Sequence, residues 1–269
     1  MKQNSIKALS IQIRLSGLSF CILNRTTHTI ELLDRILLEK KATPYELLNH
    51  LKSYIENNDA MVQSFDSVTC IYQNELSCLV PNELFDDTKL ADYLKFNAKI
   101  LQSDYISYDD LALNKSANVY IPLVNINNYL FDIYGSFEYR HASSILIETL
   151  LQRTITFSED ALFINVNELN FEIICIKDKK LMLYNSFEYH SKEDFIYYIL
   201  FTIEQLKLNT ETIKTFLSGQ IQLDDELFAI AYKYIRHVSM IEPSNSFKID
   251  AHIQRGQDHD HYIILNSFS

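Results

Sequence analysis

The sequence predicts an α/β protein built from two copies of one unit, a three-stranded β-meander followed by a helix. In the second half, ALFINV, FEIICI and LMLYNSF are separated by short polar turns within residues 161–189. Near the N-terminus, ALSIQIRLSG, LSFCILN and TIELLDRI repeat this arrangement. Runs of Ile, Val, Phe and Tyr broken by short polar turns are typical of a meander. The repetition predicts a duplicated protein with two lobes.

Composition limits the partners of the protein. The chain has 269 residues, enough for one large domain or two moderate ones. A hydrophobic content of 47% with only four Gly and four Pro residues indicates a globular protein without low-complexity segments. The formal net charge of −11 disfavours binding to nucleic acid or to anionic lipid. We therefore expect no nucleic-acid partner.

The segments that would direct a chain to a membrane are not recognisable. The first residues, MKQNSIKALSIQIRLSG, lack the continuous apolar core of a signal peptide. The apolar runs are far shorter than the roughly 20 residues that span a bilayer. We expect a cytoplasmic protein that does not insert directly into a membrane.

The four cysteines are dispersed along the chain at Cys21, Cys70, Cys78 and Cys175, and none forms a CxxC pair. Reduced, structural thiols are favoured in a cytoplasmic protein. The alternative is a cross-strand disulfide between Cys70 and Cys78, because VTCIYQ and LSCLV read as the two strands of a hairpin.

The first half contains further elements after its meander. Thr43-Pro44-Tyr45-Glu46 supplies an N-cap, a proline at the first helical position and an acid in the first turn. The predicted elements that follow are a helix YELLNHLKSYIENN, strands DSVTCIYQ and LSCLVP, a helix from Asp86 to about Leu101, strands DYISYDDL and NVYIPLV, a short helix Asn125–Tyr134, a strand FEYRHA and a helix SSILIETLLQRT.

The second half repeats this plan with fewer insertions. Ser191 is predicted to cap the helix DFIYYILFTIEQLKL, which is apolar nearly all round and is expected deep in the core. A strand ETIKTFLSG, a helix DDELFAIAYKYI and a strand RHVSMIE follow, and HYIILNSF is predicted as a small C-terminal strand. Residues 157–160 form the one plausible hinge. We therefore predict a first lobe at 1–157, with inserted strands and helices, and a second lobe at 158–269.

Residues 164–173, INVNELNFEI, have the shape of a phosphate-binding loop. The motif they resemble runs apolar, Asp, apolar, Gly, Gly, Gly, Thr, apolar, Asp, apolar, and it is the second phosphate loop of the actin-like ATPase and sugar-kinase superfamily. The resemblance implies a duplicated, ribonuclease H-like fold in which each lobe has a mixed five-stranded sheet, a meander plus parallel strands, with flanking helices. The apolar positions match. The functional positions do not: Asn165 replaces the Asp, and Asn167, Glu168 and Leu169 replace the glycines.

The two other signatures of the superfamily are also lost. In the first copy, Ser10 or Gln12 stands where an Asp is expected, and residues 14–16 (Arg-Leu-Ser) stand where the first phosphate loop needs small residues. The third signature, a Gly-Gly pair after an apolar strand, is reduced to Gly219-Gln220. Glycine lets the backbone N–H groups approach phosphate oxygens, and the aspartates orient Mg²⁺. Losing all three elements indicates a pseudo-enzyme.

Two hypotheses of function follow. The first is a non-catalytic interaction or assembly module with a protein partner and no cofactor; a homodimer is left open. It resembles the cytoplasmic actin-like platforms of type II secretion and type IV pilus assembly, and an uncharacterised bacterial family with the same lost motifs.

The rival hypothesis is a nucleotide-binding protein, or a weak ATPase or phosphotransferase, with altered phosphate loops. Its cofactor-binding residues, lining an interlobe cleft, would be Ser10, Gln12, Asn165, Asn167 and Gly219. A sensor of an uncharged small molecule is a third option.

Other polar clusters are better explained by structure than by chemistry. Residues 258–261 (Asp-His-Asp-His), with His252 nearby, could ligate Zn²⁺, but a solvated tail is favoured, and we predict no metal site and no catalytic residue. The acidic runs Asp109-Asp110 and Asp224-Asp225-Glu226 are interpreted as structural in the same way. Six aromatic residues cluster in the second meander and its helix, and a core role is favoured over a partner surface: Tyr184, Phe187, Tyr189, Phe195, Tyr197 and Tyr198.

Overall fold

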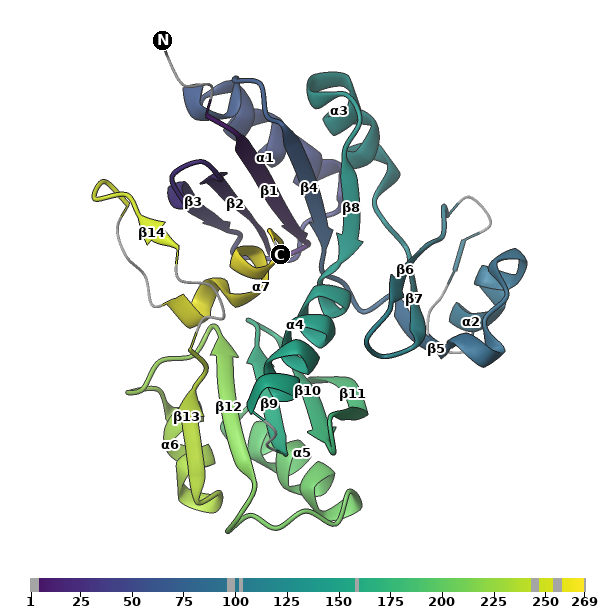
Figure 1. The fold of residues 1–269 in the computed structure, drawn as a ribbon, viewed down its shortest axis with the longest axis vertical. Helices are drawn as coiled ribbons and strands as arrows, with labels where there is room; N and C mark the ends of the chain where they lie inside the picture. Colours follow the sequence, from purple (N-terminus) through teal and green to yellow (C-terminus); the bar gives the residue numbers. More distant parts are fainter. Residues whose placement is uncertain are drawn as a thin grey trace. The chain divides into compact units, whose positions relative to one another are not determined.

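The computed structural model describes residues 5–95, 100–101, 104–157, 160–242, 247–253 and 258–268. Its strands form three sheets, of six, five and three strands (Figure 1). The chain divides into unit 1, Met1–Leu146 with Asn245–Arg255 and Ile263–Ser269, and unit 2, Ile147–Ser244 with Gly256–Tyr262. The lobe boundary predicted at residue 157 remains a prediction.

The six-stranded sheet of unit 1 begins with the predicted meander. β1 (Lys7–Arg14) pairs antiparallel with β2 (Gly17–Asn24), and β2 pairs antiparallel with β3 (Thr29–Leu37). β4 (Ser67–Tyr72) runs parallel to β1, and β8 (Glu138–His141) runs parallel to β4. The strand order is therefore β3-β2-β1-β4-β8, with the two-residue β14 (Lys248–Ile249) added beside β3.

One face of this sheet forms the core of unit 1. Because side chains alternate along a strand, Leu9, Ile11 and Ile13 of β1 lie on the same face, and all three are buried in that core. The helices α1 (Pro44–Glu56) and α3 (Val124–Tyr134) cover it. Thr43 forms the predicted N-terminal cap of α1 as a capping box with Glu46, and Gly135 ends α3 with a φ of 74°.

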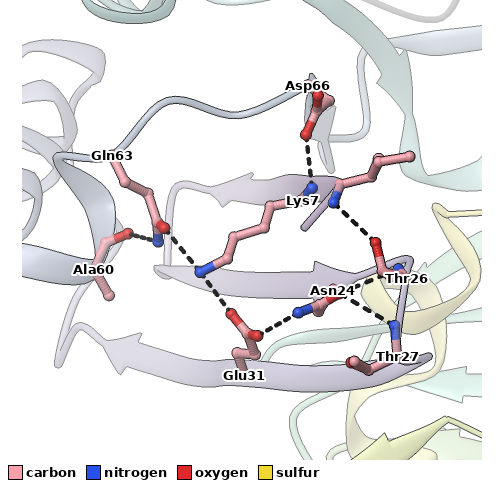
Figure 2. Close-up of polar contacts among 9 residues, drawn as sticks. Lys7, Asn24, Thr26, Thr27, Glu31, Ala60, Gln63 and Asp66 are labelled. Atoms are coloured by element: carbon pink, nitrogen blue, oxygen red, sulfur yellow. Dashed lines mark hydrogen bonds and ion pairs between the residues drawn. The ribbon is translucent and has the colours of Figure 1, made fainter. Parts of the chain in front are cut away.

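A polar network ties the start of β1 to neighbouring segments (Figure 2). The Lys7 ammonium donates to Gln63 Oε1 and pairs with Glu31 Oε2 of β3, both at 2.9 Å. Asn24 Nδ2 donates to the other Glu31 oxygen at 2.7 Å, and Asn24 Oδ1 accepts from the Thr26 and Thr27 amides. Partial burial raises the pKa of Glu31, but the bonds from Asn24 and Lys7 outweigh this and leave the pKa lowered. The carboxylate therefore stays charged and holds the strand ends together.

A three-stranded sheet is inserted between β4 and β8, in the order β5 (Ser77–Pro81), β7 (Ser116–Tyr120), β6 (Ser107–Leu111). The predicted hairpin of β4 and β5 is wrong, because the two strands belong to different sheets. Each of the four cysteines is a free thiol, so the alternative disulfide between Cys70 and Cys78 does not form. The helix predicted to reach Leu101 is shorter: a 3-10 turn, Asp87–Lys89, leads into α2 (Leu90–Leu94), and residues 96–99 lie outside the described part.

Unit 2 has the second meander at its centre. β9 (Ala161–Val166), β10 (Asn170–Lys177) and β11 (Lys180–Glu188) are antiparallel neighbours. β12 (Lys214–Gly219) runs parallel to β9 and β13 (His237–Met240) runs parallel to β12, so the order is β11-β10-β9-β12-β13. This is the mixed five-stranded sheet that the sequence predicts, and it repeats the order of the main sheet of unit 1.

Helices cover both faces of this sheet. α5 (Lys192–Gln205) and α6 (Glu226–Tyr234) lie on one face, and α4 (Ala142–Phe157) lies on the other (Figure 1). On the α4 side, the Arg153 guanidinium lies 5.6 Å from the centre of the Phe216 ring. Ser191 caps α5 as predicted, accepting from the Asp194 amide.

Two predictions in unit 2 and the C-terminal segment are wrong. α5 is not buried all round, because Tyr197 is 61% exposed and Phe201 is 46% exposed. The nearly continuous apolar sequence predicts a core helix, but aromatic side chains such as these also fit a protein surface. The segment HYIILNSF is not a strand: a 3-10 turn, Asp258–His261, continues into α7 (Tyr262–Asn266). His259 is buried there at 5% exposure, so this part of the chain is not a solvated tail.

Candidate functional site

A closed polar cluster in unit 2 occupies the position of the superfamily aspartate. Strand register brings its members together, because Asn165 of β9 lies opposite Glu172 of β10 and beside Ser218 of β12. Asn165 Nδ2 donates to Glu172 Oε2 at 2.7 Å, and Asn165 Oδ1 accepts from Ser218 Oγ at 3.0 Å. The Tyr184 hydroxyl donates to the remaining Glu172 oxygen at 2.8 Å.

The members of this cluster satisfy one another. Asn165, Glu172 and Ser218 are 3%, 4% and 5% exposed. Buried polar groups are stable when their hydrogen bonds are made within the protein. Both functional ends of the Asn165 amide are used in this way.

Gly219, at the end of β12, makes a close approach to β9. Its φ is +82°, and a Cβ at this position would lie 2.1 Å from the Val166 carbonyl oxygen and 2.9 Å from Asn165 Oδ1. The next amide, that of Gln220, donates to the same Val166 oxygen at 2.7 Å. The glycine therefore serves the packing of two strands.

The turn between β9 and β10 replaces the second phosphate loop. Its backbone N–H at Asn167 donates to the Asn170 carbonyl at 2.8 Å, and the Asn167 amide side chain donates to Asn170 Oδ1 at 2.9 Å. The Tyr189 hydroxyl donates to the Asn167 carbonyl at 2.9 Å. A phosphate loop aims backbone N–H groups at its ligand. Here the Asn167 N–H is already bonded within the turn, and the Leu169 side chain is 43% exposed.

The predicted residues of unit 1 are also buried and paired. Ser10, on β1, is fully buried, and its hydroxyl lies 2.7 Å from the hydroxyl of Ser267. Gln12, two residues further along the same face, donates to Gln73 Oε1 at 2.6 Å. A common cleft formed by Ser10 and Gln12 together with Asn165, Asn167 and Gly219 remains a prediction.

A second buried cluster in unit 1, around His141, is not predicted by the sequence analysis. His141 Nε2 donates to the Asn74 carbonyl at 3.1 Å, and its Nδ1 accepts from the Ser143 hydroxyl at 2.7 Å. Asn118 Nδ2 of β7 donates to the hydroxyls of Ser143 and Ser144, both at 2.9 Å. The inserted sheet therefore contacts the junction of β8 and α4 through side-chain hydrogen bonds.

Asp109 of β6 belongs to the same cluster. One carboxylate oxygen accepts from the Tyr120 hydroxyl at 3.1 Å, and the other accepts from the His141 amide at 2.7 Å. Burial raises the pKa of Asp109, although hydrogen bonds to Ser144 and His141 oppose this. The structural interpretation of this acid is supported by its contacts. Residues 74, 109, 118 and 141 come together only in the folded chain. Local sequence patterns therefore could not predict the cluster.

His141 gives a pH-dependent prediction. Burial lowers the pKa of its imidazole from 6.5 to about 4, because the charged form loses its hydration. A base with a lowered folded-state pKa stabilises the fold above its unfolded pKa and loses that contribution as the pH falls through the folded value. Between pH 6.5 and pH 4 the free energy of unfolding therefore falls by about 3 kcal/mol.

The measurement is urea denaturation of the wild type and of His141→Gln at pH 7 and pH 4. We expect the stability advantage of the wild type to shrink by about that amount at pH 4. Asp109, whose raised pKa acts in the opposite direction, is present in both proteins and cancels in the difference. His50→Gln, at an exposed side chain on α1, is the control for the loss of an imidazole. An equal slope in wild type and His141→Gln would contradict the prediction.

The family profile described as "Protein of unknown function (DUF3822)" matches residues 1–238. The chain belongs to this family. No curated protein matches it. Among solved structures, a Bacteroides thetaiotaomicron VPI-5482 protein with an actin-like ATPase fold and unknown function is 23% identical, with a TM-score of 0.74 over 90% of this chain and 93% of that one.

Two further structures are similar in fold. The type IV pilus biogenesis complex PilM–PilN matches at 11% identity and a TM-score of 0.60, covering 96% of each chain. The ethanolamine utilization protein EutJ from Carboxydothermus hydrogenoformans matches at 6% identity and a TM-score of 0.51, covering 99% of this chain and 90% of that one. These identities establish the fold alone. The DUF3822 chain therefore has the actin-like ATPase fold that its sequence resembles.

Among the described residues, no three side chains of His, Cys, Asp or Glu lie together in a way that could hold a metal ion. His259, in the cluster considered for Zn²⁺, instead bonds the Ile221 carbonyl at 2.7 Å. None of the described helices is both long and apolar enough to cross a membrane.

Proposed function

We propose that this DUF3822 protein is a non-catalytic interaction or assembly module of the cytoplasm. The closed cluster around Asn165 carries the proposal. An ATPase of this fold needs a carboxylate free to orient Mg²⁺ and a loop whose N–H groups are free for phosphate. This chain has an amide bonded to Glu172 and Ser218, and a turn whose Asn167 N–H is bonded internally.

The expected partner is another protein. The PilM–PilN complex is an assembly of two proteins, and it matches this chain in fold. This similarity supports a protein partner here. Unit 2 also presents aromatic side chains to solvent. Tyr197 and Phe201 of α5 stack at 6.1 Å between ring centres, and Tyr232 of α6, which is 63% exposed, stacks on Phe228 at 6.2 Å. Aromatic residues are enriched at protein interfaces.

Calorimetric titration with ATP and Mg²⁺, together with a thermal shift assay, tests the proposal. We expect no saturable heat at millimolar ATP and no rise in melting temperature. The same titration with EDTA in place of Mg²⁺ gives the background. Saturable, Mg²⁺-dependent binding that is lost in Asn165→Leu would overturn the proposal. It would instead favour the rival nucleotide-binding function through Ser10, Gln12, Asn165, Asn167 and Gly219.

A further inference from the structure

The C-terminal segment Ile263–Phe268 lies beyond the residues that the family profile matches, yet it is buried in unit 1. Ile264 is fully buried, and Leu265 and Phe268 are 5% and 7% exposed. The segment therefore has a docking surface on unit 1.

Polar contacts define where it docks. The Ser267 hydroxyl donates to the Ile264 carbonyl at 2.7 Å, so the Ser10 hydroxyl donates in the 2.7 Å contact between the two serines. Arg25 Nη1 donates to the Phe268 carbonyl at 3.3 Å. The Phe268 ring lies edge-on to Phe247, with 6.3 Å between ring centres.

The docking surface is the face of the sheet opposite the core of unit 1. Leu9 and Ile11 point into that core, so Ser10 between them points to the other face. Cys21 of β2 lies directly opposite Ser10 in the register and shares this second face. Cys21 is fully buried and is a free thiol, so it reports on whatever covers this face.

The segment is short compared with the sheet it covers. α7 has five residues, too few to be stable alone, since isolated helices shorter than ~12 residues are marginal in water. The sheet beneath it is held by ladders of eight paired residues between β1 and β2. The segment, by contrast, is attached to the sheet through its buried side chains and through the bonds at Ser10 and Arg25.

We propose that Ile263–Phe268 is a displaceable occupant of a peptide-binding face on β1 and β2. A partner segment that replaces it carries the same chemistry: consecutive aliphatic residues, then a hydroxyl that accepts from Ser10, then an aromatic ring. This inference rests on the proposed function, because it names the kind of protein segment that the module binds. A tethered occupant acts at an effective concentration on the order of millimolar, so the partner segment competes with it rather than filling an empty face.

The test measures alkylation of Cys21 by N-ethylmaleimide, read by mass spectrometry of its peptide. In a chain lacking residues 263–269 we expect at least a tenfold faster reaction at Cys21, with no change at the buried Cys70 and Cys175. A synthetic peptide of residues 258–269 added to the truncated protein should restore protection. The same peptide with Ser267→Ala should restore it less well.

A second variant keeps the proposal testable if the truncated chain does not fold. In the full chain, Ser267→Ala removes the bond to Ser10, and alkylation of Cys21 should rise at least threefold without a change at Cys175. Protection of Cys21 in the folded truncated chain, failure of the peptide to restore it, or equal acceleration at Cys21, Cys70 and Cys175 would overturn the proposal. No nucleotide is present in this assay, so its outcome is independent of the ATP titration.

Discussion

Replacing Asn165 with aspartate, the residue that active superfamily members carry, is expected to destabilise the protein by about 2–4 kcal/mol at pH 7.5. The Asn165 amide now donates to Glu172 Oε2 over 2.7 Å. An aspartate would place a second carboxylate against the first in a buried site. Two carboxylates at this distance cannot both be ionised cheaply, so the folded-state pKa of the pair is raised.

The loss of stability in Asn165→Asp is expected to depend on pH. When a carboxyl pKa is higher in the folded than in the unfolded state, the destabilisation is absent at pH values below the unfolded pKa of ~4 and grows as the pH rises. Urea denaturation of Asn165→Asp at pH 4 and pH 7.5 should therefore show the larger loss at pH 7.5. Asn167→Asp, in the half-buried turn, is the matched control and should cost less than about 1 kcal/mol. Equal losses at both pH values would contradict the role given to Glu172.

Gly219→Ala is expected to cost about 3 kcal/mol or more in the free energy of unfolding. Two penalties combine: a φ of +82°, which disfavours any residue with a Cβ, and an approach of 2.1 Å between that Cβ and the Val166 carbonyl oxygen. The clash is with backbone, so β9 and β12 would have to separate.

Gly135→Ala provides the matched control for this substitution. Its φ is +74°, but no heavy atom lies within 4 Å of an added Cβ. It therefore carries the conformational penalty alone, about 1–2 kcal/mol. The difference between the two variants in thermal or urea denaturation measures the strand contact. Equal effects would mean that the approach at Gly219 relaxes without cost.

The order of elements could be predicted from the sequence because it depends on local patterns. Runs of Ile, Val, Phe and Tyr between short polar turns mark β1 to β3 and β9 to β11, and local caps mark the starts of α1 and α5 at Thr43 and Ser191. The resemblance of residues 164–173 to a phosphate loop then pointed to the fold that the comparisons show. It also located Asn165, which lies in the closed cluster.

The predictions that are wrong concern residues whose bonding partners lie far apart in the sequence. β4 and β5 look like a hairpin because they are adjacent in sequence, but their hydrogen bonds go to β1 and β7. The cluster around His141 could not be predicted because Asn74 and Asp109, which bond it, are more than 30 residues away in the sequence. α7 was expected to be a strand because IILNSF has high β-propensity, and its contacts in unit 1 decide otherwise. Tertiary contacts override short-range preference in each case.

Unit 1 is assembled from segments that lie on either side of Ile147–Ser244 in the sequence, and this sets an order of events during synthesis. Its N-terminal strands leave the ribosome first, but β14 and the segment carrying Ser267 follow only after all of Ile147–Ser244 has been made. At ~5–20 residues per second, this interval lasts roughly 5–20 s. Throughout that time Ser10 and Cys21 lack the segment that later docks beside them. A nascent chain in this state presents an open sheet face, which is where chaperone binding or premature association between chains would begin.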